Sequence, residues 1–229
     1  MGTRVLSGDP PIEISLRRSA RARRMTLRVS GLDGRVTLTL PQRVPEAEGL
    51  GFARTREAWL RQALARRPDA AAAGPGTTLP VDGRQRLVVA AAVAAARVEA
   101  DRIVLRADRP AGPQLAAVLR ALARRRIGAA VDRHAAVLGV RPARLTLRDT
   151  RSRWGSCSGA GNLMFSWRLI LAPADVLDYV AAHEVAHLVR MDHSPAFWSV
   201  VADLLPGYHA PRLWLRRNGA ELHRWRFGD

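Results

Sequence analysis

The sequence lacks a disulfide framework, because Cys157 is the one cysteine among its 229 residues. A single thiol cannot form an internal cross-link, and this usage is typical of proteins kept in a reducing compartment. A long apolar run is also missing, since the longest uncharged one, at 87–96, is too short to cross a bilayer. Charged residues interrupt the N-terminus from Arg4 onward, so no hydrophobic signal region is expected there. These absences predict a cytoplasmic protein with no membrane partner.

Lysine is missing as well, so all 37 basic residues are arginine, and the formal net charge is +17. Alanine, glycine and proline are abundant too, which indicates a compositional bias of the kind seen in GC-rich genomes. The charge still attracts polyanions in a salt-dependent way. Non-specific binding of nucleic acid or nucleotides through the arginines is therefore a candidate interaction, and a solvated charged face is the alternative. The densest clusters lie at 17–28 and 124–126.

The patterns that are present predict an α+β fold. Alternating apolar residues at 25–29 and 36–40 flank a glycine-containing turn at 31–34 and predict a β-hairpin. A helix is expected at about 52–67, ended by Pro68. The stretch up to Gly76 is rich in alanine, glycine and proline and predicts a linker.

Short strands are expected between Leu79 and Leu105, although the alanine run at 90–96 would also suit a helix. A long helix is expected over 114–138. The Pro- and Gly-rich segment 109–113 separates these parts. No internal repeat is evident. We therefore expect a β-rich N-terminal region with one helix at 1–110 and a second domain at 111–229.

The pentapeptide HEVAH at 183–187 is the most informative pattern in the chain. Neither proline nor glycine interrupts residues 175–191, and apolar residues recur there at helical spacing. Side chains four positions apart share a helix face, so His183 and His187 can bind one metal ion from the same side. Glu184 projects roughly 100° away and can act on a water at that metal without being a ligand. The pattern predicts a catalytic zinc site.

A third ligand is expected from the turn that follows the helix. Ser194 and Pro195 are typical of an N-cap and a first helical position, so the chain must turn just before them. His193 lies in that turn, where its ring can face the other two. The alternative third ligands are the carboxylates of Asp203 and Glu221. Three protein ligands leave one position open for water, which marks a catalytic site.

Zinc in such a site makes hydroxide available at neutral pH. We expect Glu184 to take the proton from the attacking water as general base and to return it to the leaving amine. Peptide hydrolysis is the default reaction for this arrangement. The same parts can also attack a phosphoryl centre.

The segment RWGSCS at 153–158 lies between strands expected near 145–147 and 163–167, with a turn at 159–162. A strand beside the zinc helix offers backbone groups with which an extended peptide can pair. Arg153, Trp154 and Ser156 are the candidate substrate-binding residues. In the alternative, Trp154 and Cys157 are core residues and Gly155 serves a bulge.

Aromatic residues follow the histidines. Phe197 and Trp198 are expected to pack the second helix beneath the zinc site. Tyr208 could stabilise a developing oxyanion, but a packing role is the stronger expectation.

These segments together resemble the YgjP-like metallopeptidase family. The resemblance covers roughly residues 12–219 and implies zinc bound by His183, His187 and His193, with Glu184 as the catalytic base. It also implies kinship with SprT- and WLM-type proteases, some of which act on proteins attached to DNA. Some relatives within the family have been assigned nucleotide pyrophosphatase activity. The segments that carry the resemblance are RWGSCS at 153–158, FSWRLI at 165–170, HEVAHL at 183–188 and HSPAFW at 193–198.

The sequence thus predicts an α+β protein with a β-rich N-terminal region followed by a zincin-like metallopeptidase domain built on an HExxH active-site helix. The leading function is a zinc metallopeptidase acting on exposed polypeptide segments. A zinc-dependent nucleotide pyrophosphatase, whose substrate phosphates the arginines would bind, is the first alternative. A DNA-associated SprT-like protease is the second.

Overall fold

The computed structural model of the chain describes residues 2–30, 34–65 and 69–228. The chain folds as two compact units, Met1–Pro68 and Asp69–Asp229, each with its own hydrophobic core. The division expected after residue 110 does not coincide with this boundary. Leu79, Val88 and Leu105 are fully buried in the same core as Leu115 of the long helix, so the strands before residue 110 belong to the second unit.

The first unit holds a four-stranded sheet of order β1-β2-β4-β3. Strands β3 and β4 form the expected hairpin, in which Val29 pairs with Val36 and Leu27 with Leu38. Most of its expected turn, residues 31–33, lies outside the described residues. The other two strands of this sheet were not predicted from the sequence. The bounds are β1 Gly2–Leu6, β2 Ile12–Ser19, β3 Thr26–Val29 and β4 Val36–Pro41.

Two helices replace the single helix expected at 52–67. Helix α1 spans Glu46–Thr55 and α2 spans Glu57–Ala65. The backbone leaves the helical conformation at Arg56 (φ −109°, ψ 12°), which separates the two. Helix α1 begins directly after Pro45, and two glutamates in its first turn complement the helix dipole.

The second unit begins with a sheet of order β6-β7-β9-β8. Its outer pairs are antiparallel and its central pair, β7 with β9, is parallel. The sheet of the first unit has the same arrangement, with β2 and β4 as its parallel central pair. The topology therefore repeats although the sequence shows no repeat. The bounds are β6 Thr78–Val81, β7 Arg84–Ala91, β8 Arg97–Val98 and β9 Arg102–Arg106.

Two segments differ from expectation in this region. The expected linker before Gly76 contains the short strand β5 (Ala71–Ala72), which pairs in parallel with β13 (Trp225–Arg226) near the C-terminus. The alanine run at 90–96 is not helical, since β7 ends at Ala91 and the rest is irregular.

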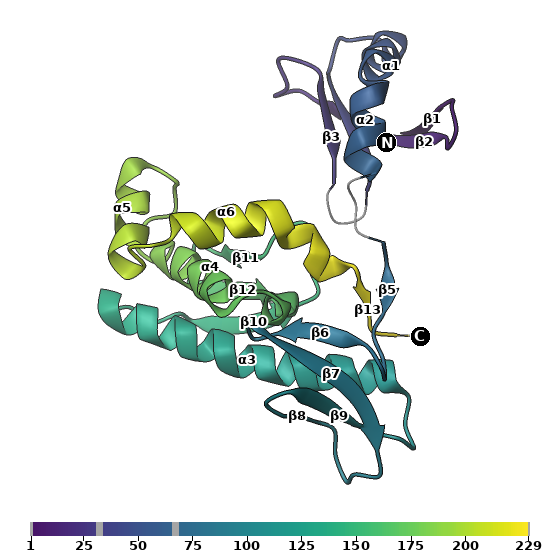
Figure 1. Cartoon of the computed structure of the whole chain (residues 1–229). Coiled ribbons are helices and arrows are strands. Elements are labelled where there is room, and N and C mark those ends of the chain that lie inside the picture. The colour runs from purple at the N-terminus through teal and green to yellow at the C-terminus, as the bar shows by residue number, and fades with distance from the viewer. Residues whose placement is uncertain (1, 31–33, 66–68, 229) are drawn as a thin grey trace. The chain divides into compact units, whose positions relative to one another are not determined.

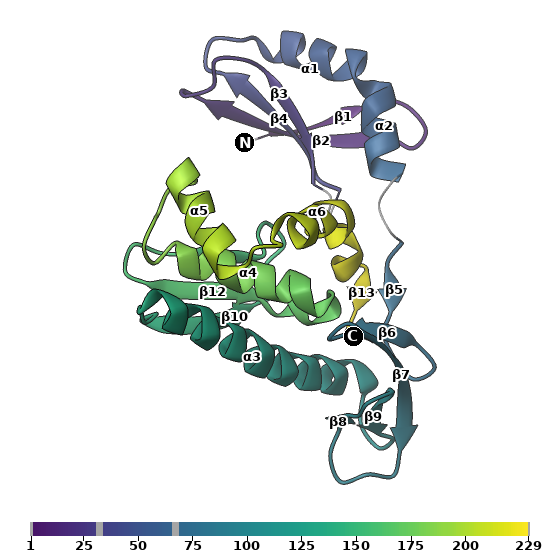
Figure 2. The same ribbon diagram turned by 60° about the vertical axis from the view of Figure 1, so that its left-hand side comes forward.

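Helix α4 occupies the centre of the second unit (Figures 1 and 2). The long α3 packs against η1 and α4, while α5, α6 and β11 pack against other faces of α4. A three-stranded sheet of order β10-β12-β11 lies beside it, with β10 parallel and β11 antiparallel to β12. The bounds are α3 Ala111–Leu138, β10 Arg144–Arg148, β11 Gly155–Cys157, β12 Asn162–Ser166, η1 Trp167–Leu171, α4 Ala174–Ala186, α5 Pro195–Leu204, α6 His209–Asn218 and η2 Gly219–His223.

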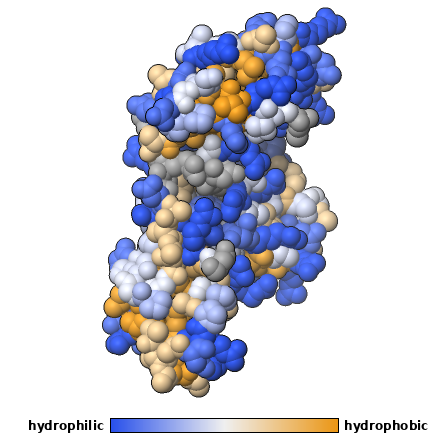
Figure 3. All heavy atoms as spheres, turned by 90° about the vertical axis from the view of Figure 1, so that its right-hand side faces the viewer, coloured by the Kyte–Doolittle hydropathy of each residue, from blue (hydrophilic) through white to orange (hydrophobic). Residues whose placement is uncertain are grey.

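The surface is mostly hydrophilic on the side shown in Figure 3. An apolar area interrupts it at the lower end of that view, where β7–β9 lie in Figure 1. Leu87 of β7 is 44% exposed. No helix within the described parts of the chain is long and apolar enough to cross a membrane.

Candidate metal centre

The HEVAH segment lies across the C-terminal end of α4. The helix contains His183 and Glu184 and ends at Ala186, although neither proline nor glycine interrupts residues 175–191. His187 is its C-cap and keeps a right-handed helical conformation, with its amide N–H donating to the His183 carbonyl at 3.3 Å. The two rings therefore still lie one helical turn apart. The chain turns after His187, and the His187 Nδ1 lies 2.9 Å from the Arg190 carbonyl oxygen.

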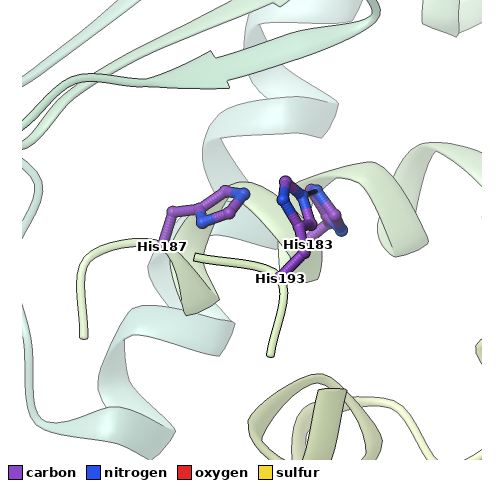
Figure 4. Close-up of side chains that lie close together, drawn as sticks. All are labelled: His183, His187 and His193. Atoms are coloured by element: carbon purple, nitrogen blue, oxygen red, sulfur yellow. Dashed lines mark hydrogen bonds between the residues drawn. The ribbon is translucent and has the colours of Figure 1, made fainter. Parts of the chain in front are cut away.

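The three predicted histidines come together. His183, His187 and His193 each present a ring nitrogen, and the three nitrogens lie within 4.8 Å of one another, a geometry that can hold a metal ion. In Figure 4 the rings of His183 and His193 overlap in the view, and the His187 ring lies to their left. The Nε2 atoms of His183 and His193 are 3.2 Å apart. Two imidazoles bound tetrahedrally to one zinc ion place their nitrogens about 3.3 Å apart, so the pair is spaced as co-ligands.

The electrostatic environment favours neutral imidazoles. Burial, reinforced by the neighbouring His187 and His193, lowers the pKa of His183 to about 3. Burial also lowers the pKa of His187, against the opposing effect of the Arg190 carbonyl. Neutral imidazole is the form that binds metals, so the rings of His183 and His187 need not lose a proton at neutral pH. Donation from the His187 Nδ1–H to Arg190 leaves its Nε2 as the free donor atom.

Phe197 forms the base on which the three imidazoles rest. Its ring is fully buried, and its centroid lies 4.4 Å from that of His187 and 4.9 Å from those of His183 and His193. Trp198 flanks His183 and His193 at 5.6 and 6.0 Å. The expected packing of these two aromatic residues beneath the site is confirmed.

The position of His193 is fixed by the start of α5. The Ser194 hydroxyl accepts a hydrogen bond from the Phe197 amide at 3.4 Å and donates one to Asp192 at 2.7 Å. Ser194 is therefore the N-cap and Pro195 the first helical residue, as the sequence predicts. The connection between α4 and α5 thus brings His193 back toward His183.

Glu184 is buried against β11. Glu184 is 5% exposed. Burial raises the pKa of its carboxyl group to about 8, against the opposing charge of Arg153. A Cβ atom on Gly155 would lie 2.5 Å from the Glu184 Oε1 and 2.6 Å from its Cγ. Gly155 therefore makes the space in which this carboxylate lies. The role considered for this glycine from the sequence was a bulge.

The three candidate substrate residues have different surroundings. Arg153 is exposed near Glu184, and Ser156 lies in β11, the edge strand of its sheet, opposite Met164. Trp154 instead packs against the His223 ring at 4.9 Å and joins the core. Its surroundings match the alternative of a core residue. Cys157 is half-buried.

The alternative ligands and the candidate oxyanion residue lie outside the histidine cluster. Among the described residues, neither Asp203 nor Glu221 belongs to it; Asp203 is exposed and Glu221 pairs with Arg224 at 3.3 Å. Tyr208 is 7% exposed and its ring stacks between Trp198 and Tyr179. Its surroundings are those of a packed residue.

Two residues near the histidines escaped the sequence analysis. The Tyr179 ring lies 6.0 Å from that of His183, and burial raises the pKa of its hydroxyl to about 12. Arg212 of α6 lies with its guanidinium carbon 4.2 Å from the Trp198 ring centroid. Tyr179 stands one helical turn before His183, which is a signal the sequence offered. Nothing in the sequence points to Arg212, because it reaches the site through tertiary packing.

The sequence model of the YgjP-like metallopeptidase domain matches residues 23–218. The chain belongs to the YgjP-like metallopeptidase family. The match extends across both compact units, so the YgjP-like sequence pattern includes most of the first sheet as well as the histidine cluster. Membership in this family implies a metal ion and a polypeptide substrate.

Comparison with solved structures adds a partial similarity. The YgjP-like chain is similar to the crystal structure of the metallopeptidase zymogen of Pyrococcus abyssi abylysin, with 21% identity and a TM-score of 0.37. The similarity covers 44% of this chain and 98% of that chain. No curated protein matches the sequence.

Proposed function

We propose that this protein is a zinc-dependent metallopeptidase in which His183, His187 and His193 hold the ion and Glu184 acts as general base. The observation that carries the proposal is the convergence of three imidazole nitrogens within 4.8 Å, beside a buried carboxylate. Imidazole donors suit zinc, and three protein ligands are typical of a catalytic zinc site. When bound, zinc supplies Lewis-acid activation of water and of the scissile carbonyl.

Glu184 moves the proton in this proposal. Its carboxylate takes a proton from the attacking water and delivers it to the leaving amide nitrogen as the C–N bond breaks. Burial makes it a stronger base than a solvated glutamate, since it raises the pKa to about 8. A divalent cation nearby favours the ionised form of the carboxylate, which is the form a base needs. Gly155 keeps the carboxylate in place beside β11.

The edge strand β11 is the proposed docking place for the substrate. One edge of β11 pairs with β12, and no strand of the described chain pairs with the other edge. An extended polypeptide can add to such an edge through backbone hydrogen bonds. Ser156 on this strand and Arg153 just before it are then the residues in reach of substrate side chains. Trp154 contacts His223 and Gly219 of η2, and this packing supports the start of the strand.

The proposal is tested with an unfolded protein substrate. Zinc-loaded wild type and Glu184→Gln are incubated with it in the presence of mixed nucleoside triphosphates, and products are identified by mass spectrometry. We expect new peptide termini only with the wild type, because loss of a general base costs about 10²- to 10⁴-fold in rate. Glu184→Gln should retain its zinc. Release of nucleoside monophosphate and pyrophosphate without new peptide termini would contradict the peptidase.

Metal content tests the ligands separately. His187→Ala and His193→Ala should each lose zinc and activity together, measured by atomic absorption after dialysis. Full zinc content in His193→Ala would show that another residue is the third ligand. Asp203→Ala is the matched control, since its exposed carboxylate lies outside the cluster and its zinc content should not change.

A further inference from the structure

An arginine-lined cavity lies on another part of α4 from the histidines. It has a volume of about 460 Å³ and is formed by the β6–β7 turn, one face of α3 and the first turns of α4. None of the three histidines lines it. We call it the arginine pocket; its charged lining residues are Arg84, Arg86, Arg126, Arg133, Asp82 and Asp178.

Arg86 is built into the wall of the pocket. It is 7% exposed, its Nε donates to the Glu99 carbonyl at 2.9 Å, and its Nη1 donates to the Val81 carbonyl. Both acceptors are neutral backbone groups, so they orient the guanidinium without neutralising it. Burial lowers the pKa of Arg86 against the nearby Asp82. A buried cation held in this way is stabilised by an anion.

The carboxylates of the pocket are already engaged. Asp82 pairs with Arg126 at 2.6 Å. Asp178 pairs with Arg133 at 2.6 Å and with the His134 ring at 2.7 Å. Four arginines and two aspartates line the pocket, which leaves an excess of two positive charges. The Arg84 side chain is exposed and makes no hydrogen bond or ion pair within the described parts of the chain.

The N-terminus of α4 adds to this positive field. Ala174, the first residue of the helix, lines the pocket, and the preceding Pro173 offers no capping side chain. A Cβ atom on Gly83 would lie 3.7 Å from the Ala174 nitrogen, so the β6–β7 turn lies close to the first amide of the helix. The Val176 amide donates to the Asp175 carboxylate at 3.0 Å. Helix N-termini carry a partial positive charge that favours anions.

We propose that the arginine pocket binds the phosphate group of a small phosphate ester. A phosphate dianion matches the excess of two positive charges, and guanidinium groups bind phosphate oxygens in pairs. The volume exceeds what a bare phosphate needs, so the ligand has room for an organic part. The site takes no part in the proposed hydrolysis and holds its ligand without the metal.

Isothermal titration calorimetry of the full chain, at about 0.15 M salt, tests this proposal. The ligands are inorganic phosphate and adenosine monophosphate. We expect saturable binding that weakens about tenfold in Arg84→Gln, as for loss of one charge-assisted contact. Arg84 suits the test because its exposed side chain has no partner to leave unsatisfied. Arg125→Gln is the matched control, since it removes the same charge from α3 beside Arg126 without touching the pocket.

Two results would overturn the site. If Arg125→Gln weakens binding as much as Arg84→Gln, the ligand senses only the net charge of the protein. If binding disappears after removal of the metal by a chelator, the phosphate is a ligand of the metal centre. Tighter binding of the monophosphate than of inorganic phosphate would identify an ester as the ligand. The reverse order would contradict an ester as the ligand and leave a site for free phosphate.

Discussion

Gly155 matters because of the atom it lacks. Any side chain at this position would overlap Glu184, with a Cβ atom only 2.5 Å from a carboxylate oxygen. Glu184 directly follows His183 on α4. A displaced carboxylate would therefore lie at a different distance from the histidine rings. A residue with no chemistry of its own therefore determines where the proposed base can act.

Replacement of Gly155 by alanine should separate metal binding from catalysis. We expect Gly155→Ala to keep its full zinc content but to lose activity by about 10²-fold, because the displaced base no longer meets the reacting water. Activity on an unfolded protein and metal content by atomic absorption are the measurements. Gly159→Ala is the control, since a Cβ atom there meets nothing within 4 Å. Wild-type activity in Gly155→Ala would refute the positioning role.

At the scale of elements, the turn between α4 and α5 completes the candidate metal site. Helix α4 ends at Ala186 and α5 begins at Pro195, so His193 belongs to neither helix. Its position depends on the Ser194 cap and on the Asp192 carboxylate that the Ser194 hydroxyl contacts. Loss of the cap frees the segment that carries the third ring.

Ser194→Ala should accordingly weaken metal binding without touching a ligand. Loss of an N-cap costs about 1 kcal/mol of stability, and loss of a group that orients a ligand costs about tenfold or more in metal affinity. A competition titration with a zinc chelator and thermal unfolding measure the two effects. Ser194→Asp keeps an N-cap acceptor and should recover most of the lost stability. Equal zinc affinity in wild type and Ser194→Ala would show that α5 does not position His193.

The sequence predicts best those elements that are determined by residues close together in the chain. The hairpin of β3 and β4, helix α3 and the start of α5 follow from alternation, helical periodicity and capping residues within a few positions. The convergence of the three histidines was predicted in the same way. The end of α4 was not, because the bond between the His187 ring and the Arg190 carbonyl belongs to a turn with no glycine or proline to announce it.

Long-range pairing was the other source of error. Strand β5 exists only because residues at 225–226 lie alongside it, and the strands before residue 110 join the second unit through contacts with α3. The close approach of Gly155 to Glu184 also joins distant segments. Such contacts leave no periodic signal, so a single sequence cannot reveal them.

At the scale of the whole molecule, two sheets share one strand order and direction. Each has two outer antiparallel pairs around a parallel centre and is followed by a helix that packs on it. Their cores are separate. In the second unit the helix is α3, which also supports α4. The residues of the proposed metal chemistry, the three histidines and Glu184, all lie in the second unit.

Acid should destabilise the whole molecule partly through His223. Burial, with the charges of Arg168 and Arg151, lowers its pKa to about 4, against the opposing Asp149. Because the pKa of the folded state lies below the unfolded value of 6.5, the neutral imidazole contributes stability above that pH. This contribution decreases as the pH falls from 6.5 and is lost by about pH 4.

Urea unfolding of zinc-loaded protein at about pH 7 and about pH 5 tests this effect. We expect the free energy of unfolding of His223→Phe to change less between the two pH values than that of the wild type. In the wild type the centroid of the His223 ring lies 4.9 Å from that of Trp154. Phenylalanine keeps an aromatic ring in this position. The same pH dependence in both proteins would contradict a neutral, buried His223.

The short chain separation of the three histidines also bears on how the enzyme matures. The first and last of them are ten positions apart, so closing the loop between them costs little chain entropy. A newly made chain can therefore capture its ion locally, before distant segments have met. The contact of Glu184 with β11 joins segments farther apart in the chain, so we expect it to form later. The expected order is ion first and hydrolysis last, so that a half-folded copy would hold the proposed metal ion without being able to cut the chain beside it.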